Sequence, residues 1–67
     1  MDRSTVPALV KALAEDPHPM VRGHAAWALG RIASPAAISA LRQHYHGEFE
    51  ASVKEEILAA VELLGGV

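Results

Sequence analysis

Residues 22–30 read RGHAAWALG and place a guanidinium, an imidazole and an indole within nine positions. His24, Trp27 and Arg31 are three and four residues apart, so a helix brings them to one face. Such a face can hold helices together, with Trp27 packed in a joint between helices and His24 hydrogen-bonded in the groove beside it. It can also stack on unpaired bases, as aromatic rings and arginine planes do in RNA loops. The residues leave both interpretations open.

Arg22 lies in the first turn of a predicted helix, where a cation gains nothing from the helix dipole. A bond to an acidic residue or a carbonyl of an adjacent turn is one explanation, because Lys54 has the equivalent place in the second half of the chain. Contact with a phosphate is the other. Among the three polar or aromatic residues of this stretch, Arg22 is the one we expect to reach outward.

No group in the sequence predicts catalysis or metal binding. His44 and His46 are alternate residues, which diverge by about 200° on a helix, and only His18 and His24 remain as further imidazoles in a chain without cysteine. The carboxylates are expected in turns and first helical turns, facing solvent: Glu15, Asp16, Glu48, Glu50, Glu55, Glu56 and Glu62. We therefore predict no catalytic residue, no metal site, no cofactor site and no enzymatic activity for this segment alone.

Composition favours packed helices in a small cytoplasmic domain. The 67 residues are 51% hydrophobic, chiefly Ala, Leu, Val and Ile, and the formal net charge is −2. No apolar stretch approaches the roughly 20 residues that span a membrane, and the N-terminus lacks the core of a signal peptide. Because nucleic-acid-binding domains are usually basic, any RNA contact has to be local.

Capping and proline signals predict four helices. Ser4 or Thr5 caps the first, which ends near Glu15; the second begins at about Pro19. Ser34-Pro35 opens the third, which ends before Gly47, and Ser52 with Glu55 forms a capping box for the fourth, ended by Gly65 and Gly66. The predicted buried positions are Val6, Leu9, Val10, Leu13, Val21, Ala25, Ala28, Leu29, Ile32, Ile38, Leu41, Tyr45, Val53, Ile57, Ala60, Val61 and Leu64.

The two halves of the chain are related by a shift of 32 residues. The shift places Leu9 on Leu41, Asp16 on Glu48, Arg22 on Lys54 and Leu29 on Val61. We predict an all-α fold of two tandem αα-hairpins, which is a short HEAT-like α-solenoid fragment. Residues 1–67 form a single domain, in which repeat one covers about 4–33 and repeat two covers about 34–65. A solenoid usually needs about three or more repeats for stability. We therefore expect either a piece of a longer protein, or open ends that are covered by a neighbouring domain or by a second copy of the chain.

The stretch DPHPMVRGHAAWALG resembles the short HEAT-like repeat of the phycobilisome-lyase type, and PMVRGHAAWALGRI is similar to the C-terminal repeat segment of the epoxyqueuosine reductase family. That resemblance implies an iron-sulfur and cobalamin oxidoreductase that completes queuosine in transfer RNA. The cobalamin domain and the four-cysteine motifs for 4Fe-4S clusters lie outside this sequence. For the present segment the resemblance implies help in docking the tRNA anticodon stem-loop and packing against the catalytic domains of the parent chain.

Two functions thus remain open, an RNA-docking tail and a protein-interaction scaffold that binds adjacent repeats or a partner. The residues expected to face RNA or a partner are Arg22, Arg31, Arg42, Lys11 and His24. The residues expected to hold the helices together are Trp27, Val21, Ala25, Leu29, Ile57 and Val61. We also expect Gly23 and Ala26 to form the contact groove for a neighbouring helix, because glycine weakens a helix unless close packing compensates.

Overall fold

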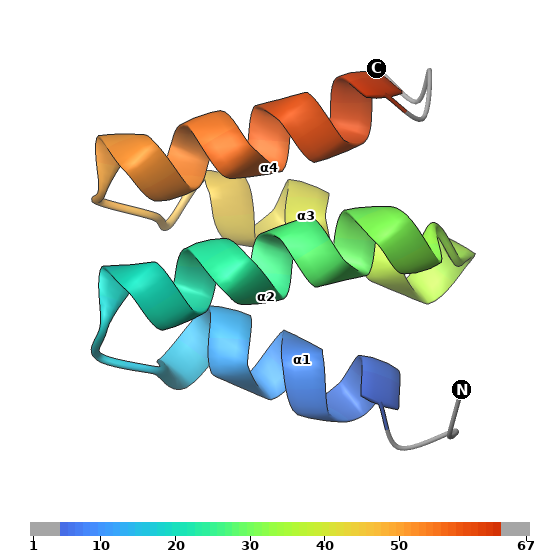
Figure 1. Cartoon of the computed structure of the whole chain (residues 1–67), viewed down its shortest axis with the longest axis horizontal. Helices are drawn as coiled ribbons and strands as arrows, with labels where there is room; N and C mark the ends of the chain where they lie inside the picture. Colours follow the sequence, from blue (N-terminus) through green and yellow to red (C-terminus); the bar gives the residue numbers. More distant parts are fainter. Residues whose placement is uncertain (1–4, 64–67) are drawn as a thin grey trace.

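The computed structural model describes residues 5–63, which form four α-helices in two antiparallel hairpins: α1 (Thr5–Glu15), α2 (Pro19–Ile32), α3 (Pro35–Tyr45) and α4 (Ala51–Leu63). The α1–α2 and α3–α4 turns lie at one end of the molecule, on the left in Figure 1, and α3 lies behind α2 and α4. The predicted all-α fold of two tandem hairpins is confirmed.

Proline and serine set the helix boundaries much as predicted. Pro19 is the first residue of α2, and His18 before it is extended and makes no side-chain cap. The Ser34 hydroxyl accepts a hydrogen bond from the backbone N–H of Ala37 and so caps α3. The fourth helix begins at Ala51, so Ser52 is inside its first turn and the expected capping box is wrong. Ser4, Leu64, Gly65 and Gly66 lie outside the described residues.

The link between the two hairpins is only two residues long, Ala33 and Ser34. Ala33 adopts a left-handed conformation with φ 58°, and its N–H donates to the carbonyl of Leu29. Glycine is the usual residue at this position, because a Cβ is strained there. The chain thus turns from α2 directly into the Ser34 cap of α3.

Apolar side chains from all four helices form one buried core. The buried set is Leu13, Ala25, Ala26, Leu29, Ala37, Leu41, Val53, Ile57, Ala60 and Val61, with Val6, Leu9, Val10, Ala12 and Tyr45 packed against it. The burial predicted for Ala25, Leu29, Ile57 and Val61 is confirmed. Val21 is not buried, because 39% of its surface is exposed.

The two hairpins approach each other closely at Gly30, where α2 lies beside α4. A Cβ added at Gly30 would lie 2.6 Å from the Cβ of Ala60 and 3.3 Å from its Cα, whereas one added at Gly23 would meet nothing within 4 Å. Ala26 is fully buried as expected. The contact groove therefore uses Ala26 and Gly30, and the expectation for Gly23 is wrong because that glycine faces open space.

Alanine substitutions at the two glycines should have opposite effects on stability. Gly30→Ala forces α2 away from α4, and the overpacking cost of about 1–3 kcal/mol exceeds the gain in helix propensity. Gly23→Ala meets no neighbour and should stabilise the protein by up to about 1 kcal/mol. Urea unfolding followed by circular dichroism measures both. Equal effects of the two substitutions would contradict the assignment of Gly30 as the contact.

Candidate functional site

The most connected polar group in the described residues is the carboxylate of Glu48, in the α3–α4 turn. Only 4% of the residue is exposed. Glu48 Oε1 accepts from Arg22 Nε at 2.9 Å and lies 2.7 Å from His44 Nε2. Oε2 accepts from Arg22 Nη2 and from the backbone N–H of Glu50, each at 3.0 Å. The carboxylate thus has about as many partners as it has lone pairs.

Arg22 is held on both sides by these contacts. Its remaining amino group, Nη1, donates to the backbone carbonyl of Asp16 at 2.8 Å. The guanidinium therefore joins the α1–α2 turn of the first repeat to the α3–α4 turn of the second. The prediction that Arg22 reaches outward to a partner is wrong, and the alternative of a bond to an acidic residue and a carbonyl is confirmed. The reason is the bidentate fit between guanidinium and carboxylate.

The expectation that Glu48 faces solvent is also wrong, and Glu48 is the residue of this site that sequence reasoning missed. Its alignment with Asp16 in the 32-residue repeat was the available signal, because it marks an acidic residue at a fixed place in each turn. What the alignment does not show is that the acid of the second repeat pairs with the base of the first.

The contacts of Glu48 decide its charge state. Burial alone would raise the pKa of the carboxyl group, but the hydrogen bonds from Arg22, the Glu50 N–H and His44 outweigh burial and lower the pKa from 4.5 to about 2. The hydrogen bond to Glu48 likewise raises the pKa of Arg22 above its ordinary value. The pair is therefore ionised at neutral pH.

The lowered pKa of Glu48 predicts a loss of stability in acid. A group whose pKa is lower in the folded state contributes its full stability above the unfolded value, 4.5, and loses it as the pH falls toward about 2. The thermal midpoint should therefore fall across this window. At neutral pH, Glu48→Gln should lower the free energy of unfolding by about 2 kcal/mol and with it the thermal midpoint. In acid, the midpoint of this variant should fall less with pH than that of the parent chain.

Glu55→Gln is the matched control, because Glu55 is an exposed carboxylate on α4. It should leave both the midpoint and the acid transition close to those of the parent chain. Thermal unfolding followed by circular dichroism at a series of pH values compares the two variants. If the two give the same profile, Glu48 does not couple the repeats in the way the contacts indicate.

Trp27 lies on the side of α2 that faces α4 but is not buried between helices. Its exposed fraction is 56%, so the predicted packing of Trp27 in the helix joint is wrong. The Cζ of Arg31 is 5.4 Å from the centre of the Trp27 ring, within cation–π distance. The pair lines a shallow groove with Gly30, Glu56, Ala59 and Ala60. We call Trp27, Arg31, Glu56 and Ala59 the inner face.

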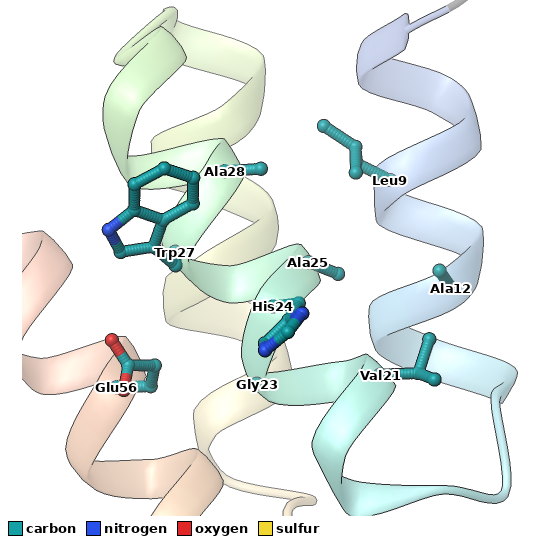
Figure 2. A pocket seen from close by; sticks show the side chains of 9 residues that line it. All are labelled: Leu9, Ala12, Val21, Gly23, His24, Ala25, Trp27, Ala28 and Glu56. Carbon is teal, nitrogen blue, oxygen red and sulfur yellow. The ribbon is translucent and has the colours of Figure 1, made fainter.

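A larger groove of about 690 Å³ runs over α2. Figure 2 shows Leu9 and Ala12 on α1 beside Val21, Ala25 and Ala28 on α2, with Trp27 and Glu56 on the opposite side of α2. We call Leu9, Ala12, Val21, Ala25 and Ala28 the α1–α2 groove. Val21 was expected in the interior, and it is exposed because the described chain places no helix over this groove.

The basic residues predicted to face a partner do not form one patch. His24 is exposed on α2 between the inner face and the α1–α2 groove, and Arg31 is exposed on the inner face. Lys11 lines a groove between α1 and α3, with Val10 and Gln43, whereas Arg42 lines a groove between α3 and α4. Only His24 and Arg31 are therefore placed to act together.

The described residues, 5–63, contain no group of three or more His, Asp or Glu side chains that could hold a metal ion. His44 is engaged with Glu48, and the His46 ring lies edge-on to Tyr45 with 5.7 Å between centroids. None of the helices in this part of the chain has the length and apolarity to cross a bilayer.

Comparison with known proteins gives both a family and several relatives. Residues 1–62 match the family described as HEAT repeats. The chain is 40% identical to an "Uncharacterized protein in gldA 3'region" of Geobacillus stearothermophilus and 40% identical to an epoxyqueuosine reductase of Bacillus subtilis. Each of these alignments covers 63 residues, which is 94% of this chain. An epoxyqueuosine reductase of Bacillus cereus is 35% identical over the same length. No solved structure matches.

The chain corresponds to a small part of each relative. It covers 29% of the Geobacillus protein and 16% and 17% of the two reductases from Bacillus subtilis and Bacillus cereus. The similarity therefore identifies a repeat segment that is also present in these reductases.

Proposed function

Because the chain belongs to the HEAT-repeat family and is similar to a segment of epoxyqueuosine reductases, we propose that it is a non-catalytic repeat module of such an oxidoreductase. In this proposal the module assists docking of the tRNA anticodon stem-loop during queuosine biosynthesis. It follows that the protein acts in the cytoplasm and packs against the catalytic domains of a parent chain.

The cofactors of the implied parent do not fit the residues of this chain. Fe–S clusters are held by cysteine thiolates, and the sequence has no cysteine. The proposal therefore assigns 4Fe-4S clusters and cobalamin to other parts of the parent protein and gives this segment no step in the reduction.

The observation that carries RNA docking is the exposed Trp27–Arg31 pair on the inner face. Indole and guanidinium planes stack on unpaired bases, which an anticodon loop supplies. Arg31 adds a positive charge beside Trp27. Arg22 cannot supply such a charge, because Glu48 neutralises the Arg22 guanidinium. Glu56 lies beside the pair and repels phosphate, so contact through bases suits this face better than contact through the backbone.

Trp27 is the sole tryptophan and so reports directly on its own face. Titration with a tRNA anticodon stem-loop should quench or shift its fluorescence. Trp27→Ala, measured with labelled RNA, should weaken binding about fivefold or more, because a stacked base contributes about 1–3 kcal/mol. Arg31→Ala should also weaken binding, because it removes the guanidinium plane that lies beside Trp27.

Lys11→Ala is the matched control for Arg31→Ala. It removes the same charge, but from the groove between α1 and α3. Binding should be close to that of the parent chain. Unchanged Trp27 emission, together with equal affinities of the Arg31→Ala and Lys11→Ala variants, would remove the RNA-docking proposal.

A protein-interaction scaffold is the second candidate, and the apolar character of the α1–α2 groove favours it. Leu9, Val21 and Ala28 line an open groove with few charged groups near it. Adjacent repeats or the catalytic domains of the parent chain are the partners this candidate implies. Trp27 and Glu56 line the same 690 Å³ groove, so the surfaces used by the two candidate functions adjoin each other on α2.

A further inference from the structure

The carboxylate of Glu56, on α4, has no partner within residues 5–63. Glu56 is half-buried, yet the ion pairs of these residues, Arg22–Glu48 and His44–Glu48, do not involve it. It also accepts no hydrogen bond from the groups of this part of the chain. Since no side-chain oxygen there is both buried and unpartnered, the Glu56 oxygens are open to solvent. The carboxylate is therefore free to bind a ligand.

His24, on α2, occupies the position in the first repeat that Glu56 occupies in the second. The two residues are 32 positions apart. Because α2 and α4 lie side by side and run in the same direction (Figure 1), the two side chains leave neighbouring helices at matching levels. Both line the groove of about 690 Å³. That groove thus has an imidazole on α2 and a free carboxylate on α4.

Trp27 adds a flat apolar surface beside these two polar groups. Its ring is 56% exposed, and its counterpart in the second repeat is Ala59, whose small side chain leaves the ring open. In Figure 2 the Trp27 ring lies above the Glu56 carboxylate, and the His24 ring lies to the right of that carboxylate. Gly23 lines the same groove, and a Cβ added there would meet nothing within 4 Å. Open space therefore adjoins all three side chains.

Arg31 leaves this space free. It lies over the Trp27 ring and lines the smaller groove, whereas it does not line the larger one. Trp27 and Glu56 line both grooves. A planar ligand can therefore stack on Trp27 on the side of His24, with its edge toward Glu56.

Guanine is the RNA base whose edge matches these groups. Its Watson–Crick edge presents the O6 acceptor, the N1–H donor and the N2 amino donor in a row, and an ionised carboxylate accepts two such donors with its two oxygens. Adenine and cytosine each present an amino donor next to a ring nitrogen that accepts, and uracil presents one N–H between two carbonyls. These three bases would each place an acceptor against the carboxylate, which repels it.

We propose that His24, Trp27 and Glu56 form a guanine site for a single-stranded RNA loop. The base stacks on Trp27, its N1–H and N2 amino group donate to Glu56, and its O6 accepts from the His24 ring N–H. This site rests on the proposed RNA docking and adds to it the base that is bound and the residue that selects it. It also gives an acidic residue a role on a surface that binds RNA.

Stem-loop RNAs that differ in one loop base test the selection. The loop is uridine throughout except for one guanine, inosine or adenine, which is moved through every loop position. Inosine keeps O6 and N1–H but lacks the N2 amino group. Followed by Trp27 emission, the best guanine RNA should bind about fivefold or more tightly than its inosine counterpart, because a hydrogen bond to a charged acceptor is lost. The adenine RNA should bind more weakly still.

Three variants separate the roles of the side chains. Glu56→Gln should bring the ratio of guanine to inosine affinity close to one, because an amide has a single acceptor oxygen. Glu55→Gln is the matched control, since it removes the same charge from the next residue of α4, which lines neither groove. It should keep the ratio of the parent chain. His24→Ala should weaken both RNAs equally, because both carry O6.

The stability of Glu56→Gln should equal that of the parent chain, because Glu56 has no contact of its own to lose within residues 5–63. Thermal unfolding followed by circular dichroism checks this. A changed ratio then reports on recognition of the base and not on folding.

The outcomes distinguish this site from RNA docking in general. Equal affinities for guanine and inosine RNAs that still quench Trp27 would overturn guanine selection and leave RNA docking in place. A guanine preference that survives Glu56→Gln would overturn the role of Glu56. If no stem-loop binds, guanosine monophosphate is the probe, with inosine monophosphate as its control. Amide shifts at Gly23, His24 and Glu56 with the first alone would support the guanine site and remove RNA docking, and no shifts with either would overturn both.

Discussion

The buried carboxylate of Glu48 is the interaction on which the arrangement of the four helices depends. Placing a charge inside a small protein costs several kcal/mol unless it is paired and hydrogen-bonded. Here Arg22 of α2, His44 of α3 and the Glu50 N–H satisfy it together. Because Arg22 also binds the Asp16 carbonyl, one ion pair joins both turns at the same end of the molecule.

Much of this fold could be predicted from the sequence because its signals are local. Pro19 and Ser34-Pro35 mark helix starts, since proline has no backbone N–H to lose in the first turn and serine caps it. Helical periodicity identified the buried residues Leu29 and Val61, and the 32-residue shift showed that the two hairpins are repeats.

The candidate site was less predictable, because it depends on how one helix lies against another. Gly23 and Gly30 look alike in the sequence, and only the position of Ala60 distinguishes them. Burial of Val21 was predicted from its place on the apolar stripe of the second helix, yet 39% of its surface is exposed because no helix of the described residues covers it. Trp27 was expected inside because aromatic rings usually are, but its place on α2 lies outside the contact with α4, beside Arg31.

The two-residue link at Ala33 and Ser34 restricts how such a protein can evolve. Ala33 turns the chain and Ser34 caps the next helix, so both residues of the link have a structural role. The Arg22–Glu48 pair and the Gly30–Ala60 contact both span this link. An insertion in the link would shift one hairpin along the other and break both. An added segment of 32 residues keeps the register of these contacts, because it repeats one whole hairpin with its link.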